Sequence, residues 1–98
     1  MNIRKAFAKA LKETRKAKGL TQEDFSEVSS RTYMSTLERA LKSPTLDKID
    51  ELASVLNVHP VTLLMMSYTY AKKGESIDNL FEKVSHEAKN IKTSYKKP

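Results

Sequence analysis

The sequence contains no cysteine, two glycines and three prolines among its 98 residues. Without cysteine, disulfides, thiolate metal sites and cysteine nucleophiles are excluded. The scarcity of turn-forming residues argues against a fold of many short strands. The two histidines, His59 and His86, lack the spacing of a metal-ligating pair, so we expect neither a zinc site nor a histidine-based catalytic site.

Long apolar runs are also missing. No stretch approaches the ~18 residues that cross a bilayer, and the N-terminal segment lacks the continuous apolar region of a secretory signal. Neither paired carboxylates nor a catalytic triad can be recognised. We therefore expect a protein that is not an enzyme, needs no cofactor and has no membrane partner.

Charge is abundant but uneven. Residues 1–20 carry seven positive charges and one negative, residues 21–71 carry four and seven, and residues 72–98 carry seven and four. The net charge is +6, with two basic ends around a slightly acidic centre. This pattern indicates a polyanionic partner, either nucleic acid or an anionic membrane surface, and charge alone does not choose between them.

Helical periodicity recurs along the whole chain and predicts an all-α fold. Thr21, Thr45 and Ser76 can cap helix starts, and Pro60 suits a first helical position. The expected helices are residues 3–18, a short helix from Thr21, residues 31–40 or 31–41, a helix from Thr45 to Asn57, one from Pro60 to near Tyr70, and one from Ser76. We expect the basic segment 92–98 to be frayed or disordered.

The expected third helix has two unlike sides. Its apolar side carries Met34, Leu37, Glu38 and Leu41, and its polar side carries Thr32, Ser35, Thr36 and Arg39, with Arg31 beside them. A short helix with small polar and basic side chains outward fits the DNA major groove. The preceding short helix, in which Phe25 and Val28 face inward, would complete a helix-turn-helix.

Four sequence blocks occur in an order typical of one family. They are Gly19-Leu20-Thr21-Gln22-Glu23-Asp24-Phe25, Tyr33-Met34-Ser35-Thr36-Leu37-Glu38-Arg39, Ser43-Pro44-Thr45-Leu46 and Leu52-Ala53-Ser54-Val55-Leu56-Asn57-Val58. Together they resemble the Cro and phage-repressor helix-turn-helix family over roughly residues 8–66. The resemblance implies a five-helix, lambda-repressor-like domain at residues 1–70, followed by a linker, an additional amphipathic C-terminal helix and a basic tail at 71–98.

The resemblance also implies roles for single residues. Arg31, Thr32 and Thr36 occupy positions that touch base edges, and Gln22 would bind phosphate or a flanking base. Arg15 and Glu38 match a largely buried ion pair that locks the first and third helices together.

Side-chain chemistry is consistent with these roles. Arg31 can donate two hydrogen bonds to guanine, Thr32 and Thr36 can contact a thymine methyl, and Ser35 is small enough to permit close approach to bases. The expected phosphate contacts are Tyr33, Arg39, Lys42 and Lys48, besides Gln22.

Two departures from the family pattern stand out. The segment between Phe25 and Tyr33 is two residues shorter than usual, so the turn is reduced to about Ser29-Ser30. Ala40-Leu41 stands where the family often has glycine, which allows the third helix to run longer.

These features predict a sequence-specific, double-stranded-DNA-binding transcriptional regulator, more often a repressor, in the bacterial cytoplasm with the nucleoid. Leu64, Met65 and Tyr68 would form a homodimer surface for an inverted-repeat operator, or else pack on neighbouring helices. The last helix would close the same core or extend the dimer. One alternative is an antitoxin-like interaction module that binds a partner protein through that helix and DNA secondarily. Another is a non-specific basic nucleic-acid binder.

Overall fold

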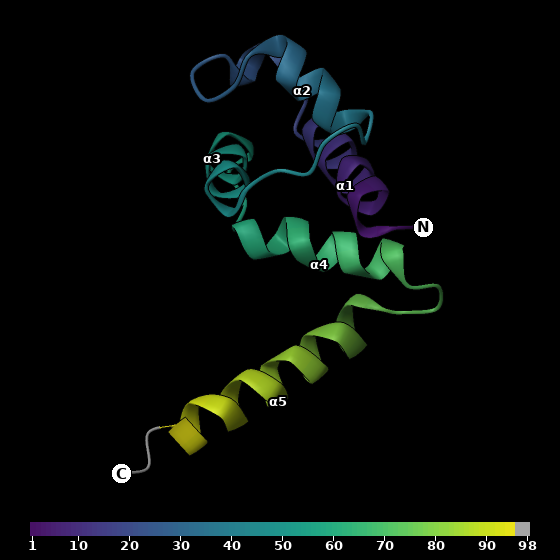
Figure 1. The fold of residues 1–98 in the computed structure, drawn as a ribbon, viewed down its shortest axis with the longest axis vertical. Coiled ribbons are helices and arrows are strands. Elements are labelled where there is room, and N and C mark those ends of the chain that lie inside the picture. The colour runs from purple at the N-terminus through teal and green to yellow at the C-terminus, as the bar shows by residue number, and fades with distance from the viewer. Residues whose placement is uncertain (96–98) are drawn as a thin grey trace.

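The computed structural model describes residues 1–95, and over this range it is all-helical (Figure 1). Its elements are α1 (Ile3–Ala17), the 3₁₀ helix η1 (Gln22–Phe25), α2 (Arg31–Glu38), α3 (Leu46–Leu56), α4 (Pro60–Ala71) and α5 (Ile77–Tyr95). The all-α prediction is confirmed. The expectation of a frayed segment 92–98 is wrong for residues 92–95, which are helical, and residues 96–98 lie outside the described range.

Helix boundaries follow local chemistry. The side chain of Asn2 accepts a hydrogen bond from the backbone N–H of Lys5 at 2.8 Å, and that of Thr45 accepts one from Lys48 at 3.1 Å. Such caps satisfy N–H groups that have no partner within the helix. Gly19 (φ 70°) and Asn57 (φ 56°) close α1 and α3 in the left-handed conformation, which these residue types adopt at low cost.

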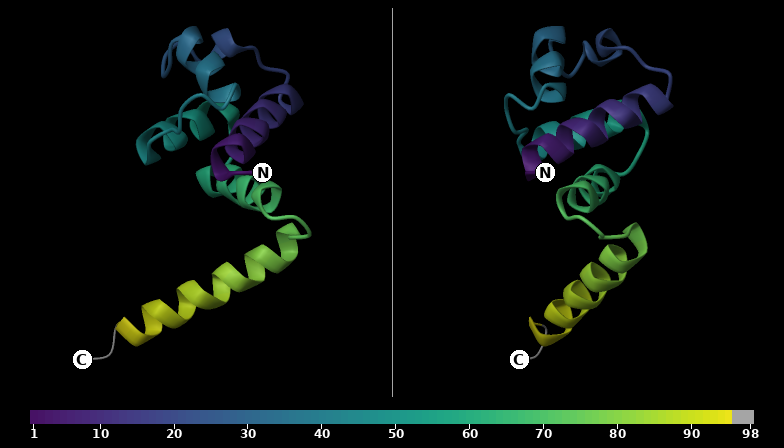
Figure 2. Two further views of the ribbon diagram at one scale, coloured as in Figure 1. Left: turned by 45° about the vertical axis from the view of Figure 1, so that its right-hand side comes forward. Right: turned by 90° about the vertical axis from the view of Figure 1, so that its right-hand side faces the viewer.

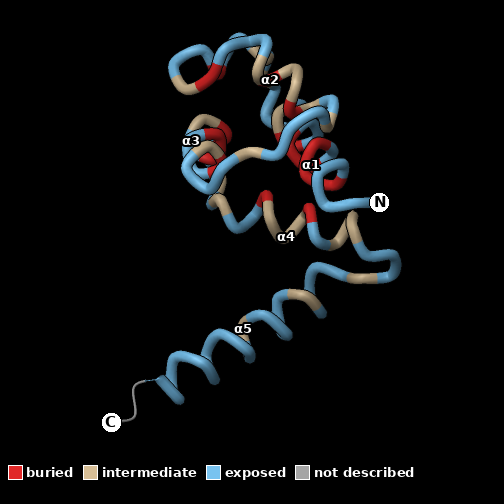
Figure 3. Tube along the Cα trace, viewed as in Figure 1, coloured by how far each residue is buried: buried red, intermediate tan, exposed pale blue. Residues whose placement is uncertain are grey.

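The core lies among α1, η1, α2, α3 and α4. Its largest fully buried apolar side chains are Leu11, Phe25, Met34, Leu37, Leu52, Leu56 and Leu63. Figure 3 shows that the buried residues are confined to this part of the molecule. Because α2 contributes two of these side chains, its orientation is fixed by the core of the domain.

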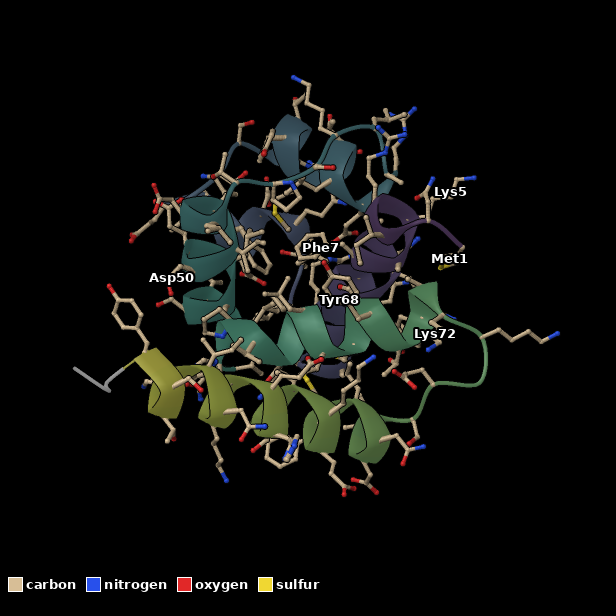
Figure 4. The ribbon with its side chains drawn as sticks, turned by 60° about the horizontal axis from the view of Figure 1, so that its bottom comes forward. Met1, Lys5, Phe7, Asp50, Tyr68 and Lys72 are labelled. Atoms are coloured by element: carbon tan, nitrogen blue, oxygen red, sulfur yellow. The ribbon has the colours of Figure 1, made fainter. Side chains whose placement is uncertain are left out.

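The last helix adds nothing to this core. No residue of α5 is buried, and the helix extends from the other helices in every view (Figures 1 and 2). Its first turns run back along α4 (Figure 4). The predicted option that this helix closes the same core is therefore wrong. Within residues 1–95, none of the helices combines the length and apolarity that crossing a membrane requires.

A polar contact also joins α1 to α4. The Tyr70 hydroxyl donates a hydrogen bond to the Glu13 carboxylate, and Lys9 Nζ lies 4.3 Å from the centre of the Tyr70 ring. The hydrogen bond to Glu13, partial burial and the Glu13 charge all raise the pKa of Tyr70 above its ordinary value of 10.0. The neutral phenol is thus the form that stabilises the fold.

Tyr70→Phe tests this contact through the pH dependence of stability. A group whose pKa is raised on folding contributes stability below its unfolded value and loses it as the pH rises through the folded value. We expect Tyr70→Phe to be less stable than wild type well below pH 10.0, and the difference to shrink above it. Urea unfolding at several pH values measures this difference, and a difference that stays constant across the alkaline range would contradict the assignment.

Candidate nucleic-acid interface

The helix α2 is held at both ends and along its inner side. The Ser30 hydroxyl caps its start by accepting a hydrogen bond from the Tyr33 N–H at 3.0 Å. Met34 and Leu37 point into the core, with exposures of 0% and 1%. These contacts leave the opposite side of α2 directed away from the domain.

The end of α2 differs from the prediction. The helix stops at Glu38 instead of continuing to Ala40 or Leu41. Ala40 takes the left-handed conformation (φ 60°), and the Leu41 N–H returns to the Thr36 carbonyl at 3.0 Å. Helices commonly end with this hydrogen-bond pattern on a glycine in the left-handed conformation, and here alanine occupies the glycine position. Leu41 consequently leaves the apolar side of α2 and is 55% exposed, so its predicted place in the core is wrong.

Ala40→Gly should therefore stabilise the protein. Alanine pays about 1–2 kcal/mol for the left-handed conformation, whereas glycine adopts it freely but loses more entropy on folding, so we expect a net gain of about 1 kcal/mol. Asn57→Gly, at the equivalent end of α3, should gain less, since asparagine already tolerates this conformation. Chemical denaturation measures both values. A less stable Ala40→Gly variant would show that Ala40 is not strained.

The polar side of α2 is open. Arg31 and Thr32 are exposed, and Ser35 and Thr36 are half-buried. The Thr36 hydroxyl donates to the Thr32 carbonyl at 2.9 Å, which orients the threonine and leaves its oxygen free to accept. Arg31 Nη1 lies 3.9 Å from Glu23 Oε1, but both side chains are about three-quarters exposed. So weak a contact leaves the guanidinium available.

An ion pair fixes the angle between α1 and α2. Arg15 Nε lies 2.6 Å from Glu38 Oε2, and Arg15 Nη2 donates to Glu38 Oε1 at 2.9 Å, which makes the pair bidentate. Arg15 Nη1 also donates to the Leu20 carbonyl at 2.9 Å. The two side chains are only 12% and 3% exposed. The hydrogen bond to Glu38 raises the pKa of Arg15 above its ordinary value, so the guanidinium stays charged.

Gln22 belongs to the same cluster. Its side-chain amide donates to Glu38 Oε1 at 3.2 Å, so one of its two amide hydrogens is engaged within the protein. This contact joins η1 to α2, a structural role of Gln22 that was not predicted from the sequence. The spacing of Gln22 and Glu38 along the chain carries no helical signal that would have indicated it.

The helix before α2 is shorter than expected, and the connection to α2 runs over residues 26–30, which is longer than the predicted turn of about Ser29-Ser30. The helix predicted from Thr21 is a single 3₁₀ turn, η1, followed by turns in which the Phe25 carbonyl accepts hydrogen bonds from Val28 and Ser29 N–H, both at 2.9 Å. The Asp24 carboxylate accepts a hydrogen bond from the Thr21 N–H at 2.7 Å, which holds the start of this turn.

Lys48 secures this turn from α3. Its ammonium donates to the Val28 carbonyl and lies 2.9 Å from Glu51. It also lies 5.8 Å from the centre of the Tyr33 ring, which is half-buried against the core. The ammonium expected to meet phosphate is thus engaged by the protein itself. Nothing in the local sequence pointed to a contact between Lys48 and Val28.

The other predicted residues lie in three places. Arg39 and Lys42 are exposed just beyond the end of α2. On α4, Leu64 and Tyr68 line a small cleft against α1 of about 160 Å³, where Tyr68 lies near Phe7 (Figure 4). Met65 instead lines a groove between α4 and α5. The three residues expected at a dimer surface therefore face two sides of α4.

Comparison with known proteins identifies the same class as the geometry, a helix-turn-helix protein. The chain matches the helix-turn-helix family over residues 11–63, just over half of its length. It is similar to a curated protein of Sinorhizobium fredii (strain NBRC 101917 / NGR234), "Uncharacterized HTH-type transcriptional regulator y4dJ". The two are 39% identical over 66 residues, which cover 65% of this chain and 86% of the relative. No solved structure matches significantly.

The chain belongs to the helix-turn-helix family of the Cro and phage-repressor type, whose members are DNA-binding transcription regulators. The elements that define the class are η1, the short turn and α2. In residues 1–95 we find no group of three or more histidine, cysteine, aspartate or glutamate side chains arranged to hold a metal ion.

Proposed function

We propose that this protein is a sequence-specific regulator of transcription, most simply a repressor, that binds duplex DNA as a homodimer. One observation carries the proposal: α2 is anchored by the buried side chains of Met34 and Leu37, while its polar side is directed away from the core. On that side Arg31 and Thr32 are exposed, and Ser35 and Thr36 are half-buried. A helix held in this way can enter the major groove without rearrangement of the domain. Family membership supports the same reading.

Base and phosphate contacts divide between two sets of residues. We assign base recognition to Arg31, Thr32, Ser35 and Thr36. We assign phosphate contacts to Tyr33, Arg39, Lys42 and the second amide hydrogen of Gln22. Arg39 and Lys42 suit this role because both are exposed and cationic next to the polar side of α2. Phosphate contacts set the register on the duplex and the salt dependence, whereas base contacts choose the site.

The proposal includes a two-fold arrangement. A homodimer places one α2 in each of two major grooves about 34 Å apart, on an inverted-repeat operator. Of the three α4 residues expected at a dimer surface, we assign Met65, in the groove between α4 and α5, to the contact with the second copy. Leu64 and Tyr68 line the cleft against α1 and are not assigned to it. We divide the chain into a DNA-binding domain at 1–70 and an extension at 71–98, because the buried residues among the described positions 1–95 all lie between Ala6 and Ser67. DNA as the partner implies action in the bacterial cytoplasm.

Selection of bound duplexes from a random pool tests this function. We expect enrichment of one inverted repeat whose half-sites lie about one helical turn apart. A general basic binder would enrich no sequence, because phosphate contacts are the same on every duplex. Equal affinity for the recovered and the starting pools would overturn the proposal.

A further inference from the structure

Apart from Leu80, which lies beside them, the apolar residues of α5 recur at alternating intervals of four and three. We call this set the α5 stripe, and its members are Ile77, Phe81, Val84, Ala88, Ile91 and Tyr95. A strict repeat averaging 3.5 residues is the pattern by which two helices pack along a common seam, and an isolated surface helix does not require it.

The stripe is uncovered. Its large members are exposed by 46% (Ile77), 64% (Phe81), 44% (Val84), 68% (Ile91) and 90% (Tyr95). In water, so much apolar area on one side of a helix favours a partner that buries it. Within residues 1–95, the remainder of the chain provides no such partner for the second half of α5, which no other helix covers (Figures 1 and 2).

The first turns of the stripe continue into an apolar surface of α4. Ile77 and Phe81 line a groove of about 430 Å³ together with Val61, Met65 and Met66. The stripe therefore begins against apolar side chains of α4 and continues along α5 beyond this groove. Met65 is one of the residues that we assign to the dimer, so the stripe extends that surface.

Charges beside the stripe select its partner. In the repeat, Glu87 and Lys92 occupy the two positions that flank the seam, five residues apart. When two copies of α5 lie in parallel and in register, each Glu87 faces Lys92 of the second copy, which gives two attractive pairs. In an antiparallel pair, Lys92 would face Asp78 of the second copy, but the two copies of Glu87 would face and repel each other. The charge pattern thus favours a parallel pair of identical helices.

We propose that α5 is the dimerisation helix of this protein, packing its stripe in parallel against the α5 stripe of a second copy. This inference deepens the homodimer of the proposed function and rests on it for its biological purpose. Figure 1 shows α2 and α5 at opposite ends of the molecule, so pairing through α5 leaves both copies of α2 uncovered for DNA.

The first test compares two double variants of the full chain that add the same charge. Val84→Lys/Ile91→Lys places lysines in the stripe, and His86→Lys/Thr93→Lys places them on the exposed opposite side of α5. Sedimentation equilibrium without DNA gives the mass. We expect wild type and the His86/Thr93 variant at twice the chain mass of 11.1 kDa, and the Val84/Ile91 variant as a monomer, with the dimer Kd raised at least ~100-fold.

Unfolding controls keep this result interpretable. Because α5 has no buried residue, the Val84/Ile91 variant should retain a cooperatively unfolding monomer core. A wild-type monomer, or a Val84/Ile91 variant that still dimerises like wild type, would overturn the inference. A monomeric wild type that binds some other protein through the stripe would overturn it as well.

Charge reversal tests the orientation. In a parallel pair, Glu87→Lys and Lys92→Glu should each weaken the dimer about fivefold or more, and the double reversal should restore it. In an antiparallel pair, Glu87→Lys would leave the dimer affinity unchanged, because it exchanges one like-charge pair for another. Lys92→Glu would weaken such a dimer, and adding Glu87→Lys would not restore it. The latter pattern would overturn the parallel assignment.

These measurements separate the inference from the proposed function, because they need no DNA. A dimer that depends on the stripe but selects no sequence from a random pool would refute the regulator and retain the α5 pairing. A sequence-selective protein whose mass is unaffected by Val84→Lys/Ile91→Lys would refute the pairing and retain the regulator.

Discussion

Glu38→Gln should destabilise the domain by about 3–5 kcal/mol, the cost of leaving one member of a buried ion pair without its partner. The substitution removes the negative charge of the carboxylate that accepts hydrogen bonds from Arg15 Nε and Nη2. The guanidinium of Arg15, whose side chain is only 12% exposed, is then left without an opposite charge. The substitution also weakens the acceptor of the Gln22 amide. Because the pair joins α1 to α2, the loss should appear as a lower free energy of unfolding of the whole domain.

A matched double variant distinguishes pairing from packing. Arg15→Met/Glu38→Met removes both charges and keeps most of the buried volume, so it should be more stable than Glu38→Gln. Urea unfolding gives all three free energies. An exposed ion pair contributes at most about 1 kcal/mol to stability. If Glu38→Gln lowered the free energy of unfolding by less than this, the Arg15–Glu38 pair would not be what holds α2 in place.

Arg31→Ala should weaken binding to the selected operator by about 1–3 kcal/mol, roughly 5- to 150-fold, and relax the sequence preference at one position of each half-site. Since Arg31 is about three-quarters exposed and packs on no core residue, stability should be unchanged. Fluorescence anisotropy with the operator and with single-base variants measures both effects.

Lys42→Ala is the matched control for Arg31→Ala. Lys42 is exposed beyond the end of α2, where we assign a phosphate contact. Its loss should weaken binding about equally on every DNA sequence. It should also reduce the slope of the logarithm of the binding constant against the logarithm of the salt concentration by about one. If Arg31→Ala behaved in the same way, Arg31 would contact phosphate and the assignment of base readout to it would be wrong.

Where the sequence carried a local signal, it predicted the structure. Thr45 and Pro60 mark helix starts by their own chemistry, and Gly19 and Asn57 suit helix ends, so α1, α3 and α4 begin and end close to where the pattern placed them. The apolar periodicity likewise identified Met34 and Leu37 as the inner side of α2.

The errors arose where tertiary contacts or backbone geometry decide. The helix expected after Thr21 is reduced to one 3₁₀ turn, and Lys48 stabilises the connection that follows it from the distant helix α3. Alanine at the position of the family's glycine was interpreted as allowing a longer helix, so the left-handed conformation of Ala40, the end of α2 and the exposure of Leu41 were missed. The periodicity of α5 predicted an apolar side but could not tell whether the same chain covers it.

Methylation interference on the selected operator tests the central claim most directly, because methylation of guanine N7 blocks the major groove without altering the phosphates. We expect interference at a guanine in each half-site, at positions about one helical turn apart, and loss of this interference with Arg31→Ala. Interference confined to adenine N3 in the minor groove, or produced only by phosphate ethylation, would contradict an α2 that reads base edges.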